Sequence, residues 1–138
     1  MSNITASEAR LLNAAYAAFN ARDIRAALAT MSQDVSWPKA FKGGFAHGHE
    51  AVRDYWTEQW SEIDPRAEPV SFRREEDGRI LVDVHLVVRD PSGAVLVDQH
   101  VGHRFTLANG LLQGMEVCPL PPAGGVPAGR TWSDRLEA

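Results

Sequence analysis

Residues 81–105 read LVDVHLVVRDPSGAVLVDQHVGHRF, and this stretch decides the fold. Apolar side chains recur at every second position on both sides of the turn sequence DPSG, a pattern typical of an antiparallel hairpin. If Arg89 pairs with Ala94 across the turn, one face of the hairpin is almost entirely apolar. That face carries the pairs Val88–Val95, Leu86–Val97, Val84–Gln99 and Val82–Val101, and it continues to His103 and Phe105. We therefore expect this face to point into the protein interior.

The opposite face of the predicted hairpin carries the triplet Asp-x-His twice, as DVH and as DQH. The same register places His85 opposite Asp98 and Asp83 opposite His100. We interpret the four residues first as cross-strand pairs that fix the register or lie in a subunit interface. A zinc site ranks second, because the residue types suit zinc but their spacing is only that of an ordinary hairpin. A catalytic role ranks last, and no resident metal is expected.

Three helices are predicted before the hairpin. Thr5 and Glu8 have the spacing of a capping box, so the first helix begins there. A second apolar stripe at helical spacing runs over residues 24–31. A third helix is expected over residues 50–63, and Pro65 ends it.

Beyond Pro65 the apolar period changes from that of a helix to that of a strand. Runs at 68–75, 79–88, 94–107 and 111–117 are separated by the turn sequences EDG, DPSG and ANG. This pattern predicts a four-strand antiparallel meander. Together with three helices on one face, it gives an α+β fold.

Composition excludes several classes of function. The chain has 138 residues, 44% of them hydrophobic, which fits one compact domain with a real core. The net charge is −4 and the basic residues are spread along the chain, so nucleic acid is not an expected partner. Cys118 is the only cysteine, the N-terminus lacks the layout of a signal peptide, and no apolar run approaches the roughly 20 residues of a membrane helix. We expect a soluble, cytoplasmic protein that does not bind membranes.

Several motifs resemble one known superfamily. They are YAAFNARDIRAAL in the first two helices, DVSW in the first strand, GHEAVRDYW in the third helix and HRFTLANGLLQGMEV in the last hairpin. In these motifs the chain is similar to the nuclear transport factor 2-like (NTF2-like) superfamily, in particular to its bacterial SnoaL-like and ketosteroid-isomerase-like members.

The resemblance covers residues from about 8 to 118. It implies a cystatin-like cone of three N-terminal helices packed on a curved, mainly antiparallel sheet, in a single domain over residues 1–118. Residues 119–138 are then a tail rich in proline and glycine, in which Trp132 is a candidate lid or dimer clamp. The resemblance also implies a homodimer that associates through the outer face of the sheet.

Activity is less well defined, because this superfamily includes isomerases, cyclases, epoxide hydrolases, dehydratases and plain binding domains. Ketosteroid isomerases carry a carboxylate base late in the first strand, a tyrosine on the first helix and a carboxylic acid on the long strand. The corresponding positions here are Pro38 or Lys39, Ala15 with Tyr16 one residue further on, and Val101. Ketosteroid isomerase activity is therefore not expected. An Asp-Arg-Asp epoxide-hydrolase arrangement also has no clear match.

Residues predicted to face inward favour a pocket for a small apolar or aromatic molecule. The expected lining is Trp37, Phe41, Tyr55, Trp56, Gln99, Val101 and Met115, with Val82, Val84 and Val117 beside them. His103 is the candidate general base, although a core histidine with a satisfied hydrogen bond is the simpler interpretation. No cofactor is expected.

His47 and His49 flank Gly48 just before the third helix, where an anion could bind. A solvated loop is the simpler interpretation of this pair. Two functions remain open. One is a pocket with isomerase-, cyclase- or lyase-type acid–base chemistry, and the other is a non-catalytic binding or interaction domain.

Overall fold

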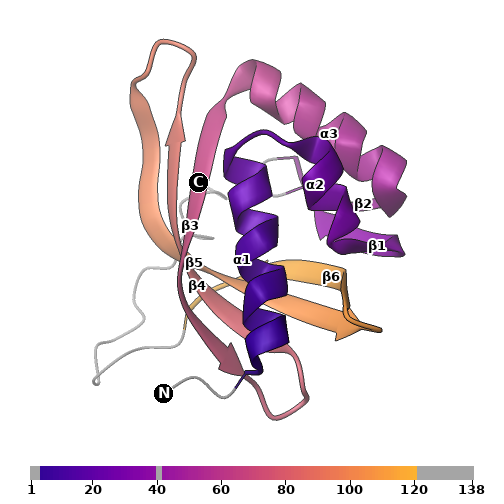
Figure 1. The fold of residues 1–138 in the computed structure, drawn as a ribbon. Coiled ribbons are helices and arrows are strands. Elements are labelled where there is room, and N and C mark those ends of the chain that lie inside the picture. Colours follow the sequence, from indigo (N-terminus) through magenta and orange to yellow (C-terminus); the bar gives the residue numbers. More distant parts are fainter. Residues whose placement is uncertain (1–3, 40–41, 121–138) are drawn as a thin grey trace, which may run out of the picture.

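The computed structural model describes residues 4–39 and 42–120 of the chain (Figure 1). Three helices are present: α1 (Ala6–Asn20), α2 (Ile24–Ala29) and α3 (Gly48–Glu62). The strands are β1 (Met31–Pro38), β2 (Phe45–His47), β3 (Asp64–Arg74), β4 (Ile80–Arg89), β5 (Val95–Ala108) and β6 (Leu111–Cys118). This arrangement confirms the expected α+β fold.

The first two helices begin where side chains cap them. The Thr5 hydroxyl accepts a hydrogen bond from the backbone N–H of Glu8, whose carboxylate accepts one from the N–H of Thr5, so the predicted capping box is formed. The Asp23 carboxylate accepts from the N–H of Ala26 and starts α2. The second helix is shorter than expected, because Met31 opens β1 instead of ending the helix.

All six strands form one sheet in the order β2-β1-β6-β5-β4-β3. β1 runs parallel to β6 and every other neighbouring pair is antiparallel. The four-strand meander was predicted, whereas the glycine-rich segment before α3, expected as a turn, contributes the short strand β2. Figure 1 shows β4 and β5 bending along their length, which makes the sheet concave toward the helices.

The register between β4 and β5 differs from the predicted one by two residues. Val84 pairs with Val101 and His85 with His100. One residue of the difference arises at the turn, where Arg89 pairs with Val95 and not with Ala94. The other arises from a bulge, because Leu96 has no partner between the pairs Arg89–Val95 and Val88–Val97. An even shift leaves every side chain on its predicted face.

The core fills the space between the helices and the concave face of the sheet. Its largest fully buried side chains include Leu12 of α1, Trp56 of α3 and Phe105 of β5. Inward positions of β4, among them Val82 and Val84, are also fully buried. The inward-facing side chains of the two long strands therefore form the floor of the core, and the helices cover it.

The free edge of β3 is held by the end of α1. The Asn20 side-chain amide donates to the Ala67 carbonyl at 2.8 Å, and the Ala67 N–H donates to the Asn20 Oδ1 at 2.9 Å. Pro65 and Pro69 lie two residues to either side of Ala67 in the same strand. A bulge follows at Val70, which has no partner between the pairs formed by Pro69 and Ser71.

Candidate functional site

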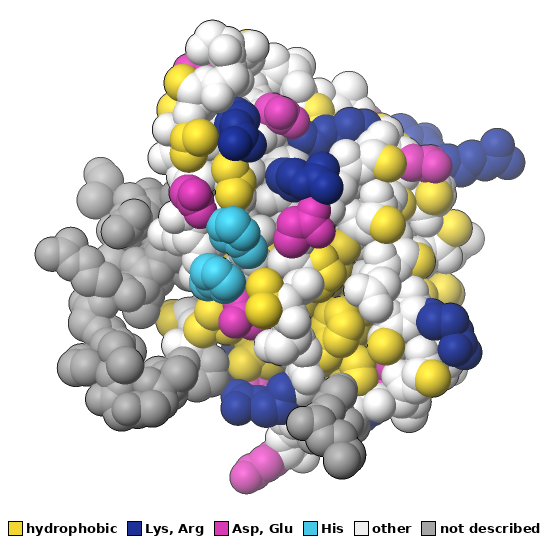
Figure 2. All heavy atoms as spheres, turned by 60° about the vertical axis from the view of Figure 1, so that its left-hand side comes forward, with side chains coloured by type: hydrophobic (Ala, Val, Ile, Leu, Met, Phe, Trp, Pro, Cys, Tyr) yellow, Lys and Arg dark blue, Asp and Glu magenta, His cyan; other side chains and the backbone are white. Residues whose placement is uncertain are grey.

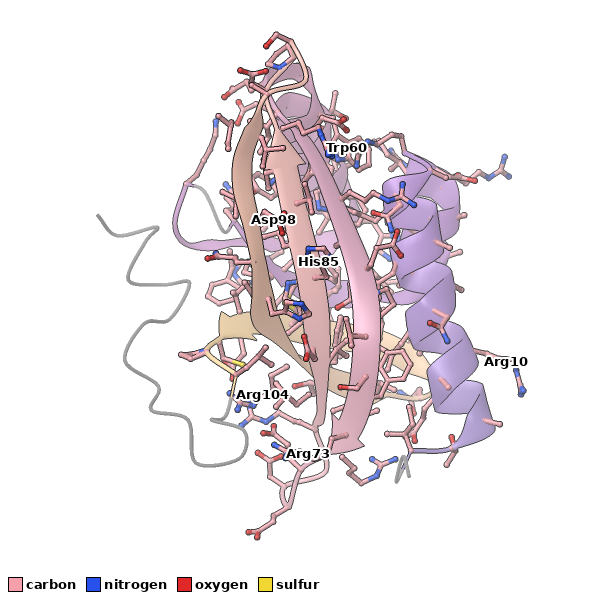
Figure 3. All side chains as sticks on the ribbon, turned by 90° about the vertical axis from the view of Figure 1, so that its left-hand side faces the viewer. Arg10, Trp60, Arg73, His85, Asp98 and Arg104 are labelled. Carbon is pink, nitrogen blue, oxygen red and sulfur yellow. The ribbon has the colours of Figure 1, made fainter. Side chains whose placement is uncertain are left out.

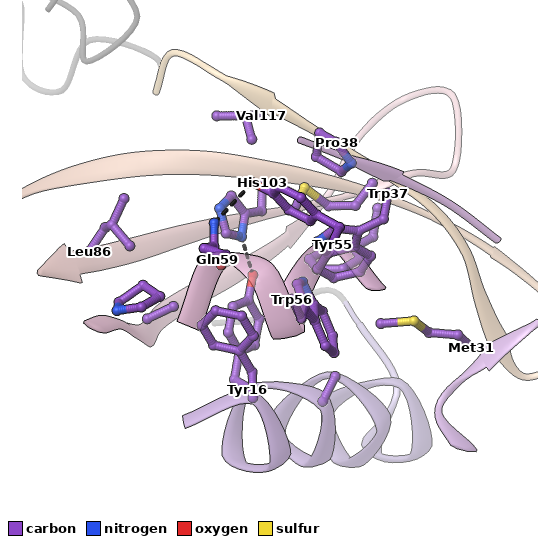
Figure 4. Close-up of a pocket in the computed structure, with 16 residues that line it drawn as sticks. Tyr16, Met31, Trp37, Pro38, Tyr55, Trp56, Gln59, Leu86, His103 and Val117 are labelled. Atoms are coloured by element: carbon purple, nitrogen blue, oxygen red, sulfur yellow. Dashed lines mark hydrogen bonds between the residues drawn. The ribbon is translucent and has the colours of Figure 1, made fainter. Parts of the chain in front are cut away.

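A cavity of about 80 Å³ lies between the helices and the concave face of the sheet (Figure 4). Its walls come from α1, α3, β1 and the inward positions of the meander. The lining residues are Ala15, Tyr16, Phe19, Met31, Trp37, Pro38, Tyr55, Trp56, Gln59, Pro65, Ala67, Leu86, His103, Phe105, Met115 and Val117. The lining is mostly aromatic and aliphatic, which suits an apolar guest.

The structure brings together six of the residues singled out from the sequence: Trp37, Tyr55, Trp56, His103, Met115 and Val117. Four others, Val82, Val84, Val101 and Gln99, do not line the cavity. Val101 is buried in the core without lining the cavity, and Gln99 sits across from Leu86 because of the two-residue shift in register. Phe41 and Trp132 lie outside the described residues.

The polar centre of the cavity is a contact between Tyr16 of α1 and His103 of β5. The Tyr16 hydroxyl lies 2.7 Å from Nδ1 of His103, and the two rings stack with centroids 5.8 Å apart. Both side chains are buried. Burial lowers the pKa of His103 to about 4 and raises the pKa of Tyr16 well above its usual value. Both groups are therefore neutral at pH 7.

Two arrangements of protons satisfy this contact. If Tyr16 donates to Nδ1, the Nε2 atom of His103 carries a proton and acts as a donor. If Nδ1 carries the proton and donates to Tyr16, Nε2 is a free acceptor and the Tyr16 hydroxyl can donate to a ligand. The pair can therefore offer a donor or an acceptor to an oxygen in the cavity without any charged group.

Sequence reasoning did not place Tyr16 in the site. The tyrosine position of the related isomerases corresponds to Ala15, so Tyr16, one residue further on, was not named as a site residue. Successive helix residues are about 100° apart, and the apolar face of α1 is wide enough that Ala15 and Tyr16 both line the cavity. The available signal was chemical, because a tyrosine in an apolar stripe needs a partner for its hydroxyl.

Aromatic rings pack closely against one another in part of the cavity wall. Trp37 and Trp56 meet edge to face with centroids 5.5 Å apart, and Trp56 packs against Phe19 at 5.2 Å. Elsewhere in the lining, Gln59 donates to the Tyr55 hydroxyl at 2.9 Å, one turn away on α3. The cavity lining therefore combines a closely packed aromatic cluster with two neutral hydrogen-bonded pairs, Tyr16–His103 and Tyr55–Gln59.

The Asp-x-His quartet lies on the other face of the sheet, outside the cavity. His85 bonds Asp98 and His100 bonds Asp83, each at 2.7 Å, so the predicted partners meet, although diagonally and not directly opposite. The two imidazoles stack at 5.0 Å with planes 9° apart. Figure 3 shows His85 and Asp98 on neighbouring strands, and in Figure 2 histidine side chains touch acidic ones on this surface.

No group of three or more His, Cys, Asp or Glu side chains in the described part of the chain is arranged to hold a metal ion. The other candidates also have structural partners. His49 lies within α3 and its Nε2 is 3.0 Å from the Met31 carbonyl, whereas His47 precedes the helix. Glu116 does not line the cavity and pairs with Arg79 and Arg104.

A family model described as the SnoaL-like domain matches residues 12–115. The chain belongs to this family. No curated protein matches it. In the described residues, no helix is both long and apolar enough to span a membrane.

Solved structures agree with this assignment. TerC, co-crystallised with polyporic acid, is 25% identical over 81% of this chain and 90% of its own, with a TM-score of 0.71. An NTF2-like protein from Burkholderia pseudomallei K96243 is also 25% identical, over 82% of this chain and 90% of its own, with a TM-score of 0.71. Rv0760c from Mycobacterium tuberculosis, in complex with estradiol-17beta-hemisuccinate, shares the fold at 16% identity over 82% of this chain and 93% of its own, with a TM-score of 0.70.

Proposed function

We propose that this protein binds a small apolar or aromatic molecule through an oxygen atom held by Tyr16 and His103. The observation that carries the proposal is the 2.7 Å contact between these two buried, neutral side chains on the wall of an aromatic cavity. A buried hydrogen-bonding pair gives orientation, and the surrounding rings give affinity. The co-crystal of TerC with polyporic acid supports a ligand in the corresponding fold. We further propose that the protein works in the cytoplasm.

The same pair could carry acid–base chemistry of the isomerase, cyclase or lyase type. A hydrogen bond from Tyr16 or from Nε2 of His103 to a carbonyl oxygen would stabilise the enolate formed when a neighbouring carbon loses its proton. Neutral imidazole is known to serve as such a donor. When Nδ1 of His103 carries the proton and Tyr16 donates to the carbonyl oxygen, Nε2 of His103 is free to act as the candidate base that takes the proton from the carbon.

The competing proposal is a non-catalytic binding or interaction domain that dimerises through the outer face of the sheet. It is favoured by the pKa of His103, since an imidazole with a pKa of about 4 is a weak base. The stacked, paired quartet on the outer face supplies polar groups for such an interface.

Binding is tested with 4-ethylphenol and ethylbenzene, which differ by one hydroxyl, using quenching of tryptophan fluorescence. We expect the phenol to bind about fivefold more tightly, because one hydrogen bond is worth roughly 1 kcal/mol. Tyr16→Phe and His103→Leu should reduce this preference. Equal affinity for the two probes in the wild type would refute the role of the pair.

Catalysis is tested separately with the bicyclic ketone 2-tetralone in D₂O. Proton NMR follows exchange of the hydrogens next to the carbonyl. If the wild type accelerates this exchange and His103→Leu does not, the result supports the proposal of acid–base catalysis. Tight binding without acceleration supports the competing proposal of a binding domain.

A further inference from the structure

A second cavity, of about 270 Å³, adjoins the first. It lies between the C-terminal end of α3 and the end of the β4–β5 hairpin. Its apolar lining comes from Ile63, Val88, Leu96 and Val97, and Lys42 and Glu62 are its charged lining residues. Lys42 is already paired with Glu58. The cavity therefore offers aliphatic surface and a cation whose charge is balanced.

Tyr55 and Gln59 line both cavities. They lie one turn apart on α3, and the Gln59 amide donates to the Tyr55 hydroxyl at 2.9 Å. The floor beneath them is continuous, since Leu86 lines the inner cavity and Val88, two residues further along β4, lines the outer one. Two strand residues span roughly 7 Å, so the cavities are separated by side chains and not by backbone.

The inner cavity alone is too small for most ligands. Its 80 Å³ compares with about 150 Å³ for an engineered apolar cavity that holds one benzene molecule, and with roughly 300–1,000 Å³ for ordinary ligand sites. A guest that reaches Tyr16 and His103 must displace part of the wall. Tyr55 and Gln59 are joined to each other by a neutral hydrogen bond and border existing space on their far side, so moving them joins the two cavities.

We propose that Tyr55 and Gln59 form a movable partition and that the two cavities together make one elongated ligand site. This inference rests on the proposed function, because it assigns the inner end of the ligand to Tyr16 and His103. The outer end is an apolar group without negative charge, because the lining there is aliphatic, Lys42 is neutralised by Glu58, and the Glu62 carboxylate would repel an anion. The substrate class is thus an elongated, uncharged molecule with an oxygen at its inner end and a hydrocarbon tail.

The test uses a series of 4-alkylphenols from ethyl to hexyl, with affinity measured by tryptophan fluorescence. Each methylene that enters the outer cavity should raise affinity about fourfold, which corresponds to about 0.8 kcal/mol per buried CH₂. Val97→Phe fills the outer cavity and should abolish this gain along the series, so that 4-hexylphenol binds no more tightly than 4-ethylphenol. Val95→Phe is the matched control, since Val95 is an exposed residue of the same strand that lines neither cavity.

Leu96→Asp gives a second variant at an exposed site, where the fold tolerates a charge. It should weaken the binding of 4-hexylphenol more than the binding of 4-ethylphenol, because only the longer chain contacts the substituted side chain. The inference is overturned if 4-ethylphenol binds and depends on Tyr16, yet longer chains bind no better or gain equally in Val97→Phe. If neither phenol binds, the proposed function and this inference both fail.

Discussion

Tyr16 and His103 are 87 positions apart in the chain, and their side chains meet at 2.7 Å inside the cavity. One comes from the first helix and the other from the long strand β5. The contact therefore joins the two layers of the fold at the point where a ligand would be held.

The buried histidine should make stability depend on pH. The pKa of His103 is about 4 in the folded protein and about 6.5 in the unfolded chain, so between these values only the unfolded chain binds the proton. The contribution of His103 is fully present above pH 6.5 and falls by roughly 3 kcal/mol as the pH approaches 4. Urea denaturation of the wild type and His103→Gln over this range measures the difference. Parallel stability curves for the two proteins would contradict the buried, neutral histidine.

Trp56 should be among the most costly residues to truncate. It is 1% exposed and contacts Phe19, Trp37 and Trp60. Trp56→Ala should lower the free energy of unfolding by about 3–5 kcal/mol, as expected for loss of a buried aromatic side chain. Trp60→Ala is the matched control on the same helix and should cost less, because Trp60 is only partly buried. A similar loss for both variants, measured by chemical denaturation, would be inconsistent with the packing described.

Two glycines of the meander should respond differently to alanine. A Cβ at Gly102 would lie 2.9 Å from both the carbonyl oxygen and the sulfur of Cys118, whereas a Cβ at Gly114 would meet its nearest atom, the Ser36 carbonyl oxygen, at 3.7 Å. Gly102→Ala should therefore destabilise the protein by about 1–3 kcal/mol, the usual cost of overpacking. Gly114→Ala should change stability little. Thermal denaturation of both variants checks the contrast, and equal melting temperatures would count against the close β5–β6 packing.

Replacing both histidines of the outer quartet should affect folding little. The hydrogen-bonded pairs are exposed, with side-chain accessibilities of 41% and 61% for His85 and Asp98, so each is worth at most about 1 kcal/mol. The double variant His85→Gln, His100→Gln should unfold near the wild-type denaturant midpoint. If the protein dimerises through this face, sedimentation velocity should show a weaker dimer for the same variant. A large loss of stability in a monomer would contradict both expectations.

The sequence could predict the faces of the sheet but not its register. Alternation of apolar residues in β4 and β5 assigns each side chain to a face, and a shift of two residues preserves that assignment. The shift itself depended on where Arg89 pairs and on a bulge at Leu96, and neither has a signal in the local pattern. This is why the partners in the quartet were predicted correctly although their pairs were not directly opposite.

The candidate site was predictable only in part, for a related reason. Trp37, Tyr55, Trp56 and His103 follow from strand and helix periodicity. The partnership of His103 with Tyr16 depends on how α1 sits over β5, and helix periodicity does not specify that rotation. Gln99 was displaced from the cavity by the same register shift that moved the hairpin pairs.

The outer edge of β3 has a consequence for how copies of this protein can meet. In a strand, alternate residues direct their backbone groups to the same side, so the amide positions of Pro65, Ala67 and Pro69 all face away from β4. The two prolines have no N–H, and that of Ala67 is occupied by Asn20. A foreign strand that approached this edge would find no free donor over these five residues, so it could not be templated there into a longer sheet. Growth of a fibril or a continuous two-molecule sheet along this part of the border is thereby disfavoured.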